Sequence, residues 1–287
     1  MLPTTTGWNK TLGQKSGGPA LADIPSGCAH WFRASWASSS DNQTHYWDAM
    51  HGTGNLRKYN SINMTLPSGD KPGFWSFDGT DDWLGMSSDG YGGDTPFSIT
   101  IDSSTKQWTL TQWVYRDSAS NSYHVYWGLG GYDDGGIVLR SHTSSANQAV
   151  LHVSQTDSQD FTHNISHTWP LNEWYQIGLT IDHDPTRSTN NTWYTFYHNG
   201  SWAGQVKSSI IPTSTALIVN VGAYMTLISD TQPISFSQEN AYVSDLHFWD
   251  RLLTASEMRH AFLGTHDINN NRYFGNPKLD DSAVDPS

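Results

Sequence analysis

The chain is short of cysteine, since Cys28 is the only one among its 287 residues. One cysteine cannot form a disulfide within the chain, so no internal cross-link holds the fold together. A chain of this length can bury a hydrophobic core large enough to do without one. This excludes the small secreted domains that depend on disulfides, and it leaves one large domain or two smaller ones.

Positive charge and glutamate are also scarce. The chain has 15 Lys and Arg against 27 Asp and Glu, which gives a formal net charge of −12. An excess of negative charge disfavours nucleic acid and anionic membrane surfaces as partners. Glu173, Glu239 and Glu257 are the only glutamates, so nearly every acid is Asp. Asp favours turns, and the bias therefore indicates a loop-rich β-protein.

Long hydrophobic runs are absent as well. No apolar stretch in the sequence approaches the roughly 20 residues that a membrane-spanning helix requires. The first eight residues have neither a charged leader nor an apolar segment, so they do not read as a signal peptide. We therefore expect no membrane partner, and a protein made in a cytoplasm that leaves it, if at all, without a signal peptide.

What the chain does contain is a period of two in its apolar residues, which is typical of β-strands. Trp108 and Val114 share one face of such a strand, and Trp113 and Tyr115 share the other. Asn199-Gly200 predicts a two-residue hairpin turn. The same alternation, broken by turn residues, predicts further strands at 123–129, 136–140, 149–153, 174–181, 193–197, 216–222 and 243–249. Many short strands separated by turns predict a β-sandwich.

One helix is predicted near the C-terminus. Thr254 is a good N-cap, and Glu257 three residues later completes a capping box. Leu253 and Met258 occupy the positions of a hydrophobic staple, and Gly264 predicts the end of the helix.

Composition divides the chain into three parts. Residues 1–29 contain Gly and Pro turns without apolar periodicity, which indicates an extended arm. Residues 30–263 carry the sandwich pattern, and residues 264–287, rich in Asn, Asp and Pro, form a tail.

The stretch 74–84 is the most acidic corner of the predicted sandwich. A strand at 74–77 is followed by the turn Asp78-Gly79 and a second strand from Trp83, with Asp81 and Asp82 between them. Carboxylates this close repel one another unless they face solvent, donors or a cation. The spacing leaves two interpretations open, a solvated hairpin end and a Ca²⁺ site.

Short motifs follow one another in a defined order along the chain. They are Trp31-Phe32-Arg33-Ala34-Ser35, Trp47-Asp48 with Gly52 and Gly54, Phe77 to Leu84, Asn172 to Ile177, Tyr197 to Gly200, and Ala241 to Arg259. Together they resemble the laminin-G-like, concanavalin A-like lectin/glucanase jelly-roll family over roughly residues 30–263. The resemblance implies an all-β, antiparallel two-sheet jelly-roll sandwich with one short C-terminal helix and extended terminal arms. It says little about any one activity.

A structural Ca²⁺ ion is a common feature of jelly rolls in this family, and Asp carboxylates suit it. By position in the matching motifs, the resemblance implies Asp48, Asp78 and Asp245 as ligands. The alternative for each is an Asp that hydrogen-bonds within a turn. The histidines show no spacing typical of zinc.

The register implied by the resemblance directs Trp113, Tyr115, Trp193 and Tyr197 outward from one sheet. Flat aromatic rings with polar residues between them suit the binding of sugars. Either a glycan uses this aromatic face, or loops, the 1–29 arm or another subunit covers it.

Catalysis is not expected. Retaining β-glucanases of this superfamily carry two Glu on one strand, and here no two Glu lie closer than Glu239 and Glu257. An Asp pair that could replace them within one strand is not evident in the sequence.

The motif arrangement resembles modules in virion proteins of tailed bacteriophages and in bacterial surface proteins. The leading hypothesis is a non-enzymatic, lectin-like module on a phage virion (head decoration, fibre or tail) that binds host-surface glycans. The second is a structural virion component that packs its aromatic face against other virion proteins or against itself. The third is a polysaccharide hydrolase that uses Asp. The predicted location is the virion, with the cytoplasm or a bacterial surface as alternatives.

Overall fold

The structure is a computed structural model that describes most of the predicted sandwich. The described residues are 25–37, 45–48, 55–59, 63–65, 74–78, 82–85, 98–99, 107–116, 125–130, 135–141, 148–156, 159–212, 217–221, 223–224, 235–236 and 240–267. The chain forms two antiparallel sheets and one short helix in these ranges, which confirms the predicted fold class. The predicted arm at 1–29 and tail at 264–287 lie largely outside them.

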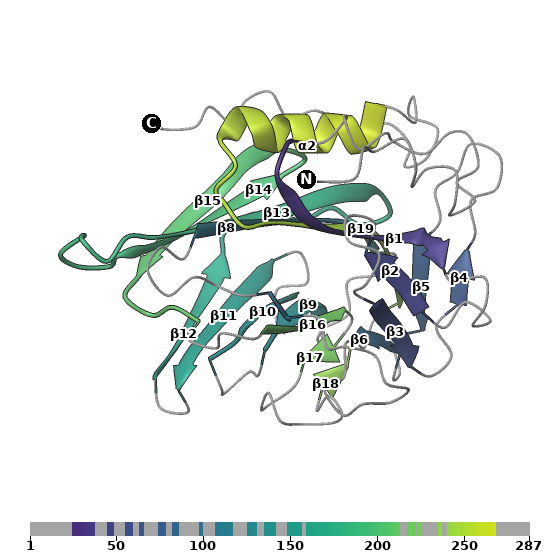
Figure 1. The fold of residues 1–287 in the computed structure, drawn as a ribbon, viewed down its shortest axis with the longest axis horizontal. Helices are drawn as coiled ribbons and strands as arrows, with labels where there is room; N and C mark the ends of the chain where they lie inside the picture. The colour runs from purple at the N-terminus through teal and green to yellow at the C-terminus, as the bar shows by residue number, and fades with distance from the viewer. Residues whose placement is uncertain are drawn as a thin grey trace, which may run out of the picture.

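The first sheet runs in the order β4–β5–β19–β8–β13–β14–β15 (Figure 1). Its strands are β4 (Asn63–Thr65), β5 (Phe74–Asp78), β19 (Asn240–Trp249), β8 (Gln107–Arg116), β13 (Trp174–His183), β14 (Thr192–His198) and β15 (Ser201–Ser208). The turn Asn199-Gly200 joins β14 to β15 as predicted, with φ of 50° and 72°. Positive φ at both residues is the signature of a type I′ hairpin turn.

The second sheet runs in the order β12–β11–β10–β9–β16–β6–β3–β2. Its strands are β12 (Gln159–Ile165), β11 (Ala149–Thr156), β10 (Ile137–Ser141), β9 (Val125–Leu129), β16 (Leu217–Val221), β6 (Trp83–Gly85), β3 (Asn55–Tyr59) and β2 (His45–Asp48). Strand β1 (Cys28–Ala37) pairs with both β2 and β19, so hydrogen bonding joins the two sheets along one side. The short strands β7 (Ser98–Ile99), β17 (Ala223–Tyr224) and β18 (Ser235–Phe236) complete the fold.

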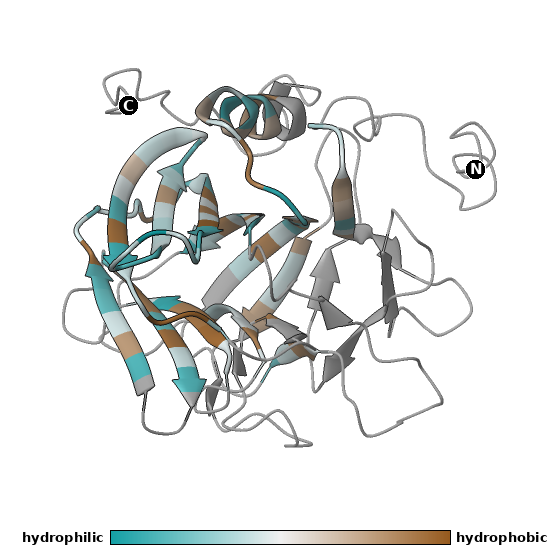
Figure 2. Cartoon of the chain, turned by 60° about the vertical axis from the view of Figure 1, so that its left-hand side comes forward, coloured by the Kyte–Doolittle hydropathy of each residue, from teal (hydrophilic) through white to brown (hydrophobic). Residues whose placement is uncertain are grey.

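The core lies between the sheets and follows the predicted alternation. Trp108, Leu110 and Val114 of β8 all belong to the main buried cluster, which confirms their inward direction. Trp113 instead packs on the other side of the strand, against Phe262. Bands of apolar and polar residues alternate along the coloured strands in Figure 2.

Helix α2 (Ala255–Asp267) lies across the outer face of the first sheet (Figure 1). The predicted capping box is present: Glu257 N donates to Thr254 Oγ1 at 3.2 Å, and Thr254 N donates to Glu257 Oε2 at 2.9 Å. The predicted end at Gly264 is wrong, because the helix continues to Asp267. A glycine inside a helix costs only about 1 kcal/mol, which the packing of the helix on the sheet offsets.

The acidic corner also differs from the hairpin that its sequence suggests. Strands β5 and β6 form where they were predicted, but β5 pairs with β4 and β19, whereas β6 pairs with β3 and β16. The connection therefore passes from one sheet to the other. Strand β12 and the strands at 45–65 were not predicted, because polar side chains interrupt their pattern. Within the described ranges, no helix has the length and apolar character needed to cross a membrane.

Candidate functional site

The outer face of the first sheet is where the sequence places its aromatic residues, and helix α2 covers the middle of that face. Trp113 is fully buried there, with its ring stacked on Phe262 at 5.4 Å between centroids. Tyr197 is 6% exposed and belongs to a buried cluster with Trp249 and Met258. Both side chains point outward as predicted, but the prediction that they form an exposed platform is wrong, because α2 packs on top of them.

Two glycines allow this close approach of α2. A Cβ at Gly178 of β13 would collide with Met258 Cε. A Cβ at Gly200 would lie 2.8 Å from Arg259 Cα and 2.9 Å from Phe262 Cβ. Gly200 also has a φ of +72°, which disfavours any residue with a side chain. Gly200 thus allows both the tight hairpin turn and the close packing of α2.

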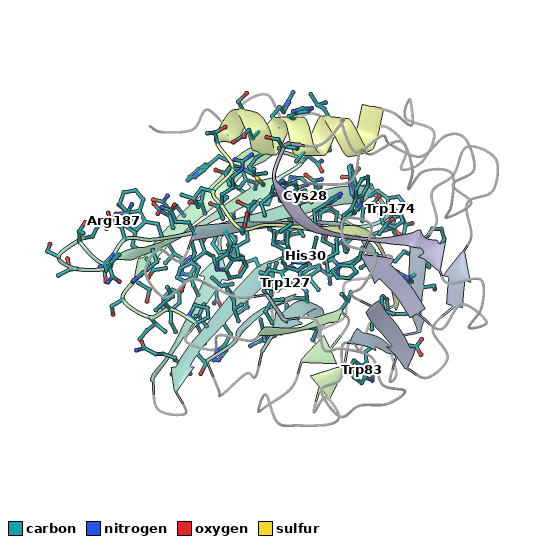
Figure 3. The ribbon with its side chains drawn as sticks, viewed as in Figure 1. Cys28, His30, Trp83, Trp127, Trp174 and Arg187 are labelled. Atoms are coloured by element: carbon teal, nitrogen blue, oxygen red, sulfur yellow. The ribbon has the colours of Figure 1, made fainter. Side chains whose placement is uncertain are left out.

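The aromatic face remains partly open at one end, beside β5. Phe74, Tyr115, Trp174 and Tyr242 come from four strands and form a closed ring of contacts, which we call the aromatic cluster. Its ring centroids are separated by 5.0 Å for Phe74–Tyr242, 5.4 Å for Tyr242–Tyr115, 5.8 Å for Tyr115–Trp174 and 5.9 Å for Trp174–Phe74. All four side chains are partly exposed. Figure 3 labels Trp174, which lies at the opposite end of the sheet from Arg187.

The register of the sheet explains why these rings meet. Trp174 of β13 is paired with Tyr115 of β8, and Tyr115 is paired with Tyr242 of β19. Directly paired residues put their side chains on the same face, about 5 Å apart. Trp75 is fully buried in the core, so its neighbour Phe74 points outward and reaches Tyr242. Tyr115 was predicted as a binding residue but the other three rings were not, because Phe74 and Tyr242 come from strands distant in sequence.

The other end of the face carries charge around Trp193. Lys207 Nζ lies 4.1 Å from the centroid of the Trp193 ring, and the Arg187 guanidinium carbon lies 4.2 Å from it. Arg187 also pairs with Asp182 at 2.6 Å and with Asp184 at 3.7 Å. The pKa of the Asp184 carboxyl is lowered, mainly by the hydroxyl of Thr186, which donates a hydrogen bond to it at 2.6 Å. Trp193 is partly exposed, and the described contacts of its ring are with cations and not with the aromatic cluster. It is therefore a separate region of the outer face.

Asp245 is the only predicted metal ligand whose side chain is described. It is 3% exposed, has a φ of 42°, and lies in a β-bulge of β19, where two residues face one residue of β8. Its Oδ1 accepts a hydrogen bond of 3.0 Å from Trp31 Nε1. Among the described residues, no group of three or more His, Cys, Asp and Glu side chains is arranged to hold a metal ion.

The register separates one predicted metal ligand from Asp245. Asp78 is paired with Asn240, which precedes Asp245 by five residues on β19. At about 3.3 Å per residue the two Asp are about 16 Å apart, too far to share one ion. Asp48 is nearer, since it is paired with Phe32, which is paired in turn with Leu246. The side chains of Asp48 and Asp78 lie outside the described residues.

Comparison with known families identifies the fold. A family model described as the concanavalin A-like lectin/glucanases superfamily matches residues 89–259. The chain belongs to this superfamily. No curated protein matches its sequence.

Solved structures with the same fold include binding domains of botulinum neurotoxins. That of serotype D/C VPI 5993 is 10% identical, with a TM-score of 0.54, and covers 83% of this chain and 52% of its own. That of serotype G is 12% identical, with a TM-score of 0.52, and covers 82% and 50%. The binding domain of neurotoxin DC in complex with SialylT is 10% identical, with a TM-score of 0.52, and covers 83% and 51%. This chain spans about half the length of these domains, and at such low identity the likeness concerns the fold alone.

The superfamily includes glucanases, so the environment of each glutamate is informative. Glu173 is exposed, one residue before β13 begins. Glu257 pairs with Arg251 at 2.7 Å, and this hydrogen bond lowers the pKa of its carboxyl to about 2. A general acid in a glycosidase needs a raised pKa, so Glu257 has a structural environment rather than a catalytic one. Glu239 lies outside the described residues.

Proposed function

We propose that this chain is a non-enzymatic, lectin-like module that binds carbohydrate through the aromatic cluster. The observation that carries the proposal is the closed set of four partly exposed rings at the open end of the outer face. The C–H faces of a sugar pack on aromatic rings, and the sugar hydroxyls need hydrogen-bonding groups at the edge. No described residue hydrogen-bonds to the hydroxyl of Tyr115 or of Tyr242, so both remain available to a ligand.

Packing supports a role in binding. Aromatic rings gain most from full burial, as Trp113 does beneath α2 on the same strand. The aromatic cluster keeps water contact although α2 lies beside it, with Trp174 packed near Phe262. A contiguous apolar patch left at a protein surface indicates an interaction site.

We further propose that the module acts on the surface of a phage particle, as a head decoration, fibre or tail protein. This part is supported by the order of the sequence motifs, the acidic composition and the absence of disulfides. It predicts that the protein sediments with purified virions of its source. Protein found only in the lysate supernatant would contradict the virion role without bearing on carbohydrate binding.

We also propose a structural Ca²⁺ with two of the three predicted ligands. The register favours Asp245 and Asp48, which lie two strands apart, and it excludes Asp78. Asp245 Oδ1 accepts the Trp31 N–H, so an ion bound here would share this carboxylate with the indole.

A glycan array with the purified protein, in the presence and absence of Ca²⁺, tests the carbohydrate proposal. We expect Tyr115→Ala to weaken binding of any hit about fivefold, because a stacking ring contributes roughly 1 kcal/mol beyond the area it covers. Tyr115→Phe is the matched control, since it keeps the ring and removes only the hydroxyl. Failure to bind any glycan would discard the proposal and favour a structural role, in which another virion protein covers the cluster.

A further inference from the structure

The second open region of the outer face has a chemistry different from that of the aromatic cluster. We propose that Trp193 and Lys207 form a binding site for an acidic sugar residue, one that carries a carboxylate. The inference rests on the proposed function for the class of ligand, but it concerns a separate site at the other end of the sheet.

The two residues are held together by the sheet itself. Trp193 of β14 is paired with Lys207 of β15, so their side chains share the outer face. The Lys207 ammonium lies 4.1 Å from the centroid of the Trp193 ring. The one register pairing of β15 among the described strands is with β14, so β15 forms an edge of the sheet. Arg187 marks this end in Figure 3, far from α2.

The two cations that contact Trp193 differ in how their charge is compensated. Arg187 donates to Asp182 Oδ2 at 2.6 Å, and Asp184 lies within 3.7 Å of it, so its charge is matched by carboxylates. Lys207 is exposed, and within the described structure the Trp193 ring is its one partner. Asp182 and Asp184 both contact Arg187, and no carboxylate among the described residues contacts the Lys207 ammonium.

The ligand that completes this site needs a carboxylate and hydrogen-bond acceptors. A carboxylate can accept a charge-assisted hydrogen bond from the Lys207 ammonium, which the aromatic ring cannot do. The indole N–H of Trp193 has no acceptor among the described residues, so it is free to donate to a ligand. An acidic sugar offers the carboxylate for Lys207 and hydroxyl acceptors for the indole N–H.

The aromatic cluster does not suit the same ligand. Glu173 is exposed, directly precedes Trp174 and has no ion-pair partner among the described residues, whereas Asp182 and Asp184 near Trp193 are paired with Arg187. The two ends of the face should therefore select different sugars, neutral at the cluster and acidic at Trp193.

NMR titration of the tryptophan indole N–H signals tests the inference. The probes are methyl β-glucuronide and methyl β-glucoside, which differ only in the carboxylate. The chain has 14 tryptophans, and Trp193→Phe and Trp174→Phe identify the two signals of interest. We expect the glucuronide to shift the Trp193 signal and the glucoside to leave it unchanged. Lys207→Gln should weaken glucuronide binding about two- to fivefold, while Lys207→Arg keeps it within about twofold.

Several outcomes would overturn the inference. They are equal shifts of the Trp193 signal by both probes, unchanged glucuronide affinity in Lys207→Gln, and a shift of the same size with sodium sulfate, which would indicate a general anion site. The Trp174 signal reports separately on the proposed function. If glycan binding at the cluster fails while glucuronide still shifts Trp193, the proposed function falls and this inference stands; the reverse result refutes only this inference.

Discussion

The covered middle of the outer face and its open end carry the same kind of side chain in different environments. Trp113 and Tyr115 are two residues apart on β8 and point the same way, yet Trp113 is fully buried and Tyr115 is partly exposed. The difference comes from α2, which lies about 150 residues further along the chain and packs on Trp113 through Phe262. Strand alternation thus sets the direction of a side chain, and a distant element decides whether it meets solvent.

The largest effect should come from removing the ring that covers Trp113. Phe262→Ala deletes a fully buried aromatic side chain, which typically costs about 3–5 kcal/mol of the free energy of unfolding. We expect a lower urea midpoint and a red-shifted tryptophan emission, since the middle of the face becomes wetter. If the emission keeps its wavelength while stability falls, α2 is not what shields Trp113.

A smaller loss of stability should follow from a substitution that pushes α2 away from the hairpin but keeps the side chains of the helix. Gly200→Ala introduces a Cβ 2.8 Å from Arg259 Cα and forces a non-glycine residue to a φ of +72°. We expect a loss of about 1–3 kcal/mol, measured by urea unfolding. Gly204→Ala on the adjacent strand is the control, because a Cβ there meets nothing within 4 Å. Equal losses in both variants would show that α2 does not press on the hairpin.

Low pH should lower the stability by a smaller amount, because it weakens the Arg251–Glu257 pair at the start of α2. The folded-state pKa of Glu257 is about 2, below its ordinary value of 4.5, so its contribution to stability is complete above pH 4.5 and is lost as pH falls toward 2. Because the carboxylate is accessible to water, we expect this contribution to be at most about 1 kcal/mol. Urea unfolding at pH 6 and pH 2.5 should show a smaller pH effect in Glu257→Gln than in the unmodified chain. An identical pH effect in both would exclude the Arg251–Glu257 pair as its source.

Calcium should have the smallest effect on stability. The proposed ion at Asp245 lies where β1 and β19 meet, and Asp245 is already held by Trp31. We expect Ca²⁺ to raise the melting temperature by about 1–2 °C over EDTA, and Asp245→Asn to remove that difference. No difference between Ca²⁺ and EDTA in the unmodified chain would remove calcium from the proposal.

Local signals predicted much of the fold. The alternation in β8 and β13, the Asn199-Gly200 turn and the Thr254 capping box depend on neighbouring residues, and the structure has all of them. Strand β12 was missed because Asp160, Thr162 and Asn164 face solvent and a half-buried His163 interrupts its inner face. Burial lowers the pKa of His163, which favours the neutral imidazole that this partly apolar position accepts.

The candidate sites were less predictable than the strands. Tyr115 and Trp193 were found from periodicity, but which rings they meet depends on pairing between strands far apart in sequence. The cover provided by α2 could not be predicted from its capping signals, since these set where the helix begins and not where it docks. The acidic corner shows the same limit, because its two strands belong to different sheets.

The seam at β1 and β2 has a mechanical consequence. Hydrogen bonds tie the two sheets together on that side, while β12 and β15 each have a single partner strand among those described. Within the described residues, the two sheets are therefore joined by hydrogen bonds along one side only, and β12 and β15 are their edge strands on the other side. Amide protons of β15 should exchange with solvent sooner than those of β8, and the Trp193–Lys207 site lies on that more yielding edge.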